Sequence, residues 1–175
     1  MNLAKRKLLV TLIRYCAAFT AVACVYTLLD FAVDIRPSGI QESYRFSLRD
    51  LAVDRVEILR QDNLAILVIK RSDETIAELE NSGNNLQDPG SDGSRQPDFA
   101  RNALRSRHPG YFVSYAIGTD LGCPVAAVGQ ELGEVCGSAR YDFAGRAFKG
   151  AKKFQNLDIP DYTFASDFST LTIRP

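Results

Sequence analysis

The sequence predicts a mainly β domain, an antiparallel sandwich or small barrel, that follows a single amino-terminal transmembrane helix. Three observations support this fold class: an apolar stretch near the amino end, a series of short β-branched and aromatic runs in the rest of the chain, and Gly-rich turns between those runs. With 175 residues, of which 46% are hydrophobic and 24% charged, the chain can bury a real core and is neither disordered nor repetitive.

The stretch from Leu8 to Leu29 has the length and composition of a membrane span. Its 22 residues carry one charge, Arg14, and a helix of that length extends about 33 Å, close to the roughly 30 Å thickness of a bilayer core. Arg14 lies near the start of the stretch, where its long side chain can reach the interface. We therefore assign residues 1–34 to a cytoplasmic amino terminus and a transmembrane anchor.

The charges on either side of this stretch predict its orientation. The basic residues 5–7 precede it, whereas Asp30 and Asp34 follow it. The positive-inside rule then places the amino end in the cytoplasm and the rest of the chain across the membrane. An alternative is a cleaved signal peptide or a lipoprotein signal with residues 21–23 before Cys24, but the apolar run continues past that position.

The segment after the span is predicted to be a tether or hinge, residues 35–45, because it is polar and contains Pro37 and Gly39. A domain covering residues 46–175 follows. Its first element is a predicted hairpin of Arg55–Arg60 and Leu64–Lys70 around a turn at residues 61–63.

A short helix is predicted to follow the hairpin. Ser72 is a suitable N-cap, and Ile76 and Leu79 have the spacing to face the core. Residues 81–98 are rich in Gly, Pro, Asn and Ser, which predicts a long surface excursion. Further short strands are predicted at Tyr111–Ile117, Glu134-Val135, Phe148-Lys149, Tyr162–Ala165 and Leu171–Ile173.

Composition excludes several classes of function. Basic and acidic residues are equal in number, 21 each, and 17 basic against 19 acidic residues remain after residue 34, so a nucleic-acid partner is not expected. One histidine and four cysteines are too few for a His-rich zinc site or a c-type haem. His108 precedes Pro109 without an evident partner, and we predict no catalytic residue.

A set of short segments follows the amino-terminal span in a distinctive order and spacing. These are Ile69–Ser72, Leu86–Pro89 through Gln96-Pro97, Pro109–Val113, Leu121–Cys123, Tyr141-Asp142, Gly145–Gly150 and Asn156–Pro160. Over nearly its whole length the chain thereby resembles the Rieske iron-sulfur subunit of bacterial cytochrome bc complexes, the ubiquinol-cytochrome c reductases. The resemblance implies a Rieske-like antiparallel β-sandwich, anchored in the bacterial inner membrane, with the domain in the periplasm.

The family holds a [2Fe-2S] cluster with two loops patterned Cys-Thr-His-Leu-Gly-Cys and Cys-Pro-Cys-His-Gly-Ser. The first Cys and the His of each loop are ligands, and the other two cysteines form a disulfide. The corresponding loops here are residues 118–123 and about 134–142, and the four ligand positions hold Gly118, Asp120, Glu134 and Gly137. Shifting the second loop by one residue restores no histidine. The resemblance therefore implies that the family cofactor is absent.

Composition leads to the same expectation. A Rieske centre needs two thiolates and two imidazoles, and the part of the chain after the span holds only Cys123, Cys136 and His108. Asp120 and Glu134, with His108, remain candidate oxygen and nitrogen ligands for Ca²⁺ or Mn²⁺. Carboxylates on loop tips are more often solvated surface, so no metal site is predicted.

Two further features follow from the resemblance. Cys123 and Cys136 occupy the family's disulfide positions, and an oxidising compartment favours their pairing; two free buried thiols are the alternative. Where the family has a proline-rich loop beside the cluster, this chain has Gly150–Gln155, which includes Lys152 and Lys153. This loop is expected to be more polar and flexible than its family counterpart, although a lysine pair is usually a solvated surface.

Together these observations predict a membrane-anchored accessory or structural subunit without redox function, in a respiratory membrane complex that contains cytochrome b-like or oxidase subunits. The alternative is an electron-transferring iron-sulfur subunit of a ubiquinol-cytochrome c reductase-type complex. Catalysis by the chain itself is not expected. Residues 5–7 read Lys-Arg-Lys without an Arg-Arg pair, which favours export by the general secretory route over the twin-arginine route.

Overall fold

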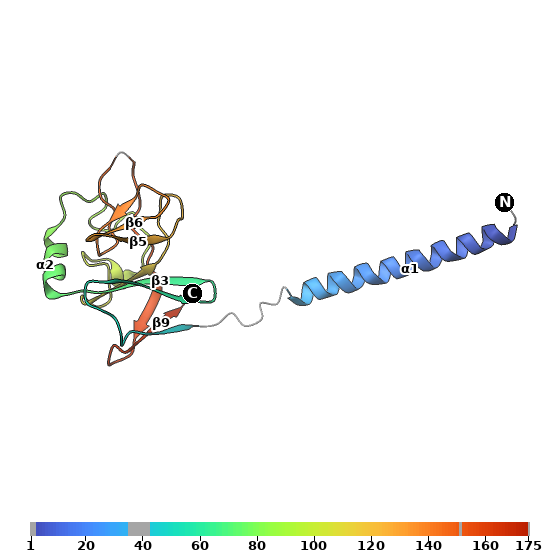
Figure 1. Ribbon diagram of the computed structural model, residues 1–175, viewed down its shortest axis with the longest axis horizontal. Helices are drawn as coiled ribbons and strands as arrows, with labels where there is room; N and C mark the ends of the chain where they lie inside the picture. The colour runs from blue at the N-terminus through green and yellow to red at the C-terminus, as the bar shows by residue number, and fades with distance from the viewer. Residues whose placement is uncertain (1–2, 35–42, 151, 175) are drawn as a thin grey trace. The chain divides into compact units, whose positions relative to one another are not determined.

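The computed structural model describes residues 3–34, 43–150 and 152–174 (Figure 1). The chain divides into two compact units, residues 1–41 and residues 42–175. Residues 35–42, the larger part of the predicted tether, lie outside the described residues.

The first unit contains one long helix, α1, Leu3–Asp34. Its segment Lys5–Phe31 is long enough to cross a bilayer and contains an 18-residue window with a mean hydropathy of 2.0. The hydroxyls of Thr11, Thr20 and Thr27 donate to backbone carbonyls of the preceding turn, which satisfies them without water. A long helix that is apolar all round is typical of a membrane anchor.

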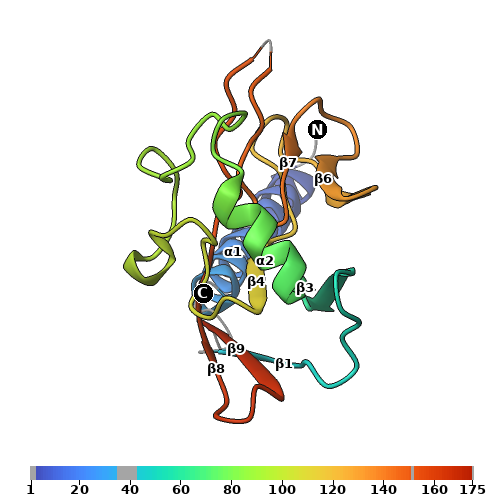
Figure 2. The same cartoon turned by 90° about the vertical axis from the view of Figure 1, so that its left-hand side faces the viewer.

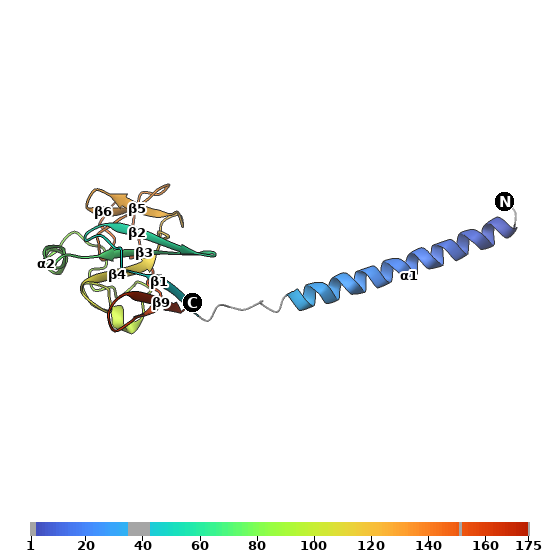
Figure 3. The ribbon, with the colours of Figure 1, turned by 60° about the horizontal axis from the view of Figure 1, so that its bottom comes forward.

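The second unit is built from short antiparallel strands. Its described strands are β1 Tyr44–Ser47, β2 Val56–Gln61, β3 Leu64–Lys70, β4 Tyr111–Tyr115, β5 Val125–Val128, β6 Glu131–Glu134, β7 Arg140–Tyr141, β8 Asp161–Phe164 and β9 Thr170–Arg174. They form three-stranded sheets in the orders β1-β9-β8, β2-β3-β4 and β5-β6-β7, with antiparallel neighbours throughout. Figure 3 shows β5 and β6 on one side of β2-β3-β4, and β1 and β9 on the other. The predicted antiparallel β domain is confirmed.

The centre of the core is β3, which lies between β2 and β4. Ile66 to Ile69 are fully buried, because a central strand packed on both faces has no side exposed to solvent. Phe112, Leu157 and Tyr162 are also fully buried and join the same cluster from other parts of the chain.

The hairpin and the short helix form as the sequence predicts. The register pairs Val56 with Ile69 and Gln61 with Leu64, so the strand extends one residue into the predicted turn. Asp62 lies in the turn with φ 51°, a left-handed conformation that two-residue hairpin turns require. Helix α2, Asp73–Asn81, is capped by Ser72, whose hydroxyl accepts from the Thr75 N–H at 3.2 Å. Leu79 is buried and Ile76 half-buried, as expected.

Several of the short strands differ from the prediction. The predicted strand Phe148-Lys149 is wrong, because Phe148 forms only an isolated bridge to Leu86. Of Glu134-Val135, only Glu134 is in a strand, as the last residue of β6. Strands β1, β5 and β7 were not predicted, and Tyr44 and Arg45, assigned to the tether, begin β1. Strands of two to four residues depend on the neighbours they pair with, which local composition does not reveal.

Buried arginines fix the long excursion 81–98 and the loops beside it. The guanidinium of Arg105 is fully buried and donates to the carbonyls of Leu157 at 2.8 Å and Gly145 at 3.0 Å, and to Gln96 Oε1 at 3.1 Å. Burial lowers the pKa of Arg105 to about 10, so the side chain is still a cation at neutral pH. Arg105 therefore connects Gln96 in the excursion with Gly145 and Leu157, which are distant in the sequence. The excursion ends at the short 3₁₀ helix η1, Asp98–Ala100.

Candidate functional site

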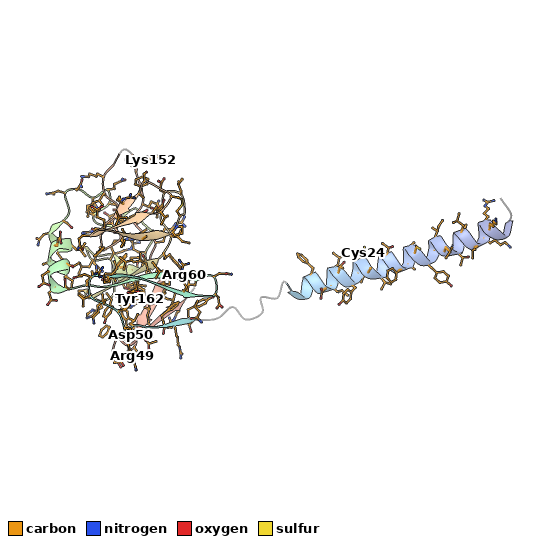
Figure 4. The ribbon with its side chains drawn as sticks, in the orientation of Figure 1. Cys24, Arg49, Asp50, Arg60, Lys152 and Tyr162 are labelled. Atoms are coloured by element: carbon orange, nitrogen blue, oxygen red, sulfur yellow. A yellow bond between two sulfur atoms is a disulfide. The ribbon has the colours of Figure 1, made fainter. Side chains whose placement is uncertain are left out.

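The loops 118–123 and 134–142 come together at one end of the domain. The first follows β4 and the second begins at the end of β6. The pairing of Val125 with Glu134 and the bond from the Val135 N–H to the Pro124 carbonyl, 2.9 Å, hold the two loops side by side. In Figure 4, Lys152 beside these loops and Arg49 lie at opposite ends of the domain.

Glu134 lies between the two loops and is only 3% exposed. Its Oε1 accepts from the Asp120 N–H at 2.8 Å and its Oε2 from the Leu121 N–H at 3.1 Å. The expectation that Glu134 is a solvated surface carboxylate is wrong, because two charge-assisted hydrogen bonds from the opposite loop offset the loss of hydration.

Asp120 makes the complementary connection from the first loop to the second. Its Oδ2 accepts from the Ser138 N–H at 3.0 Å and from the Ser138 hydroxyl at 3.3 Å. Its side chain is 9% exposed, and the Lys152 ammonium lies 3.9 Å from Oδ1. Asp120 is therefore not a freely solvated carboxylate either. Each loop contributes one carboxylate that binds backbone N–H groups of the other.

The two glycines at the remaining ligand positions border the Glu134 side chain. A Cβ atom added at Gly118 or at Gly137 would overlap the Glu134 carboxylate. Neither glycine has a left-handed φ, so the requirement for glycine here is one of space. The gap between the loops therefore has no room for a larger side chain at either position while Glu134 occupies it.

A third segment, of which the structure describes residues 149–150 and 152–155, joins the site through Thr119, a residue that was not among the predicted site residues. The Thr119 N–H donates to Tyr141 Oη at 2.9 Å, and the Thr119 hydroxyl donates to the Gln155 carbonyl at 2.6 Å. Tyr141 is fully buried, and burial raises the pKa of its hydroxyl. Thr119 retains the threonine of the family's first loop pattern, which was the available signal for its role. Figure 2 shows the described residues of this segment, 149–150 and 152–155, toward the top of the domain.

Cys123 and Cys136 form a disulfide across the loops. Their Cα atoms are 5.9 Å apart and they are 13 positions apart in the sequence. Cys136 is exposed and Cys123 half-exposed, which contradicts the alternative of two free buried thiols. In the chain-entropy description, closing a loop of this length stabilises the fold by about 3 kcal/mol.

His108 is not part of this site. It is exposed, its Nδ1 accepts from the Gly110 N–H at 3.1 Å, and its ring lies 4.6 Å from that of Phe168. Asp120 and Glu134 are thus brought together, but without the histidine. Within residues 3–34, 43–150 and 152–174, no three His, Cys, Asp or Glu side chains are grouped so as to hold a metal ion.

The residues of the two loops do not fit a [2Fe-2S] cluster of the Rieske type. The cysteines of the loops are used in the disulfide, the loops contain no imidazole, and the Glu134 side chain fills the space between Gly118 and Gly137. Each loop exposes one large apolar side chain, Leu121 at 63% and Val135 at 70%. Lys152 and Lys153 are exposed beside them.

No family model matches the chain. It is similar to the ubiquinol-cytochrome c reductase iron-sulfur subunit of Allochromatium vinosum, with 28% identity over 167 residues that cover 86% of this chain and 81% of the relative. It is also similar to a chain of a hyperthermophilic respiratory Complex III, with a TM-score of 0.48 and 15% identity, covering 91% of this chain and 96% of that one. The sequence similarity confirms the resemblance to Rieske iron-sulfur subunits. With the apolar helix α1, it indicates a single-pass membrane anchor.

Proposed function

We propose that this chain, a relative of the Rieske iron-sulfur subunits of ubiquinol-cytochrome c reductases, works without an iron-sulfur cluster as a non-redox accessory subunit of a respiratory membrane complex. The observation that supports this most directly is the position of Glu134. Its buried carboxylate occupies the gap between the two loops, and Gly118 and Gly137 leave it the room to do so.

The network around Glu134 gives a physical reason why the loops remain ordered without a metal centre. Glu134 and Asp120 bind backbone N–H groups in both directions, and the disulfide joins the same loops covalently. Charge-assisted hydrogen bonds of this kind contribute about 1.5–3 kcal/mol each. The loop end of the domain is therefore a stable surface, suited to protein contacts.

The proposed partners follow from the relative, which is a subunit of a ubiquinol-cytochrome c reductase. We infer that this chain assembles with a cytochrome b-like or an oxidase subunit in the bacterial inner membrane. The basic residues 5–7 and the acidic Asp30 and Asp34 favour a cytoplasmic amino end and a periplasmic domain.

The decisive experiment is to measure iron and acid-labile sulfide in the purified full chain, with the Allochromatium vinosum relative prepared in the same way as a positive control. We expect colourless protein without stoichiometric iron and without a rhombic electron-paramagnetic signal after reduction. Stoichiometric iron and sulfide with that signal would overturn the proposal in favour of the electron-transferring alternative.

The accessory role is tested by extraction of native membranes in mild detergent. We expect the chain to co-migrate with a cytochrome b-like or oxidase subunit, and deletion of its gene to reduce the amount of the assembled complex. A chain that migrates alone, with the complex unaffected by its deletion, would contradict the role.

Export provides a third test. A chain without a cluster has no need to fold in the cytoplasm, so we expect the domain to reach the periplasm in cells that lack the twin-arginine translocase. Retention in the cytoplasm of those cells would contradict this prediction and would indicate that the domain folds before export and uses the twin-arginine route.

A further inference from the structure

A groove of about 210 Å³ lies between α2 and the β5–β6 hairpin, and of the two loops described above it includes only Asp142 in its lining. Its apolar lining comes from Leu79, Phe143 and Phe148, and its polar lining includes Glu78 from α2 and Glu131 from β6. Leu79 and Phe143 are buried, Phe148 is half-buried, and both glutamates are exposed. The groove thus combines an apolar floor with carboxylates at its rim.

The walls of the groove are held together by a buried arginine. Arg146, 2% exposed, donates from Nη2 to the Leu79 carbonyl at 2.7 Å and to Ser82 Oγ at 3.0 Å, and from Nε to Asp142 Oδ2 at 2.8 Å. These bonds fix the end of α2 against the segment that follows β7. The shape of the groove is therefore preformed, and the charge of Asp142 is already balanced by Arg146.

The rim carries negative charge that the domain does not neutralise. Helix α2 contains four acidic residues and no basic residue, and Glu131 faces the groove from β6. Among the described residues, neither Glu78 nor Glu131 is within ion-pair distance of a basic side chain; the ion pairs present involve other carboxylates. An anionic lipid surface would be repelled by this rim, whereas a cationic side chain would be attracted.

We propose that this groove binds an arginine side chain presented by a segment of a partner protein. The aliphatic part of an arginine packs on the floor formed by Leu79 and Phe148, while its guanidinium lies between the carboxylates of Glu78 and Glu131. The proposal rests on the proposed function only in identifying the partner as a neighbouring subunit; the groove and its chemistry do not depend on the absent cluster.

The test uses the full ¹⁵N-labelled chain in detergent micelles, titrated with a short neutral peptide that carries one central arginine. The same peptide with citrulline, which has the shape of arginine without its charge, is the matched control. We expect the arginine peptide to shift the backbone amides of Leu79, Glu131 and Phe148, and the citrulline peptide to bind roughly tenfold more weakly or not at all.

Two variants locate the interaction. Glu78→Gln with Glu131→Gln removes the rim charge and is expected to weaken binding of the arginine peptide roughly tenfold, with an otherwise unchanged amide spectrum. Asp50→Asn with Glu57→Gln removes two exposed acidic residues elsewhere and is expected to leave binding unchanged.

The proposal is overturned by equal binding of the two peptides, by no shift at the groove, or by equal weakening in both variants. Reproduction of the same shifts by Ca²⁺ alone would also overturn it, since that indicates a simple cation site. Iron measured in the same sample separates the two proposals: iron with arginine binding refutes only the accessory role, and iron-free protein without arginine binding refutes only the groove.

Discussion

The position of Glu134 makes a specific prediction for Gly118→Ala. A Cβ at residue 118 would overlap Oε1, Cγ and Cδ of Glu134, and the φ of Gly118 is not left-handed, so alanine meets no backbone penalty there. The added methyl group must displace the carboxylate from the Asp120 and Leu121 N–H groups. The substitution is therefore expected to break the network that joins the two loops.

The magnitude follows from the two hydrogen bonds. Each charge-assisted bond contributes about 1.5–3 kcal/mol, and the lower part of that range applies to the bond from Leu121, because this residue is exposed and the bond is only partly buried. We expect Gly118→Ala to lower the free energy of unfolding by about 3–4 kcal/mol, the sum of the two bonds. Glu134→Ala removes the same two bonds and is expected to cost about as much.

The double variant distinguishes this explanation from others. In Glu134→Ala, all three atoms that the new Cβ would meet are gone, so adding Gly118→Ala should cost little more than Glu134→Ala alone. Independent effects would sum to about 6–8 kcal/mol, and the shared mechanism predicts about 3–4 kcal/mol. Gly83→Ala is the matched control, since a Cβ there meets no atom within 4 Å, and it should change stability by less than about 1 kcal/mol.

The assay is urea unfolding of the full chain in detergent with the disulfide intact, followed by circular dichroism of the β signal. The slope of the transition must be equal among variants for the free energies to be compared. Additive costs in the double variant would show that Glu134 does not fill the space beside Gly118, and would remove the main support for loops ordered without a metal centre.

Two further predictions concern buried charges. Arg105→Met should lower the free energy of unfolding by about 3–5 kcal/mol in the same assay, because the carbonyls of Leu157 and Gly145 lose a buried cationic donor; a loss below about 1 kcal/mol would contradict the role of this arginine. The pKa of Asp158 is raised by burial, against the opposing effect of Arg95 and Arg105. Its charged form is thus less stable in the folded protein than in the unfolded chain, and stability from this group falls as the pH rises from the ordinary value of 3.8 through the raised pKa. Asp158→Asn should therefore be more stable than the parent chain at neutral pH, with the difference disappearing below that window; a difference independent of pH would refute this assignment.

Much of the architecture could be predicted from local sequence. The apolar stretch within α1, the hairpin of β2 and β3, and the Ser72 cap are determined by hydrophobicity, β-branched composition and capping chemistry over a few consecutive residues. Strands β5 and β7 were not predictable in this way. They have four and two residues, and they exist because β6 lies between them.

The candidate site likewise has features that the sequence determines and features that depend on the tertiary structure. The sequence alone determined that Gly118, Asp120, Glu134 and Gly137 stand where the resembled family has its ligands, and that one histidine cannot supply two imidazoles, since residue identity decides which atoms can bind a metal. Only the tertiary structure decided what those residues do instead. A carboxylate on a loop is ordinarily hydrated. Glu134 is buried because its carboxylate binds backbone N–H groups of the first loop, which are 13 and 14 residues away in the sequence, and because Gly118 and Gly137 leave room for it. Burial of a charge depends on donors contributed by distant segments, and the fold brings those donors together.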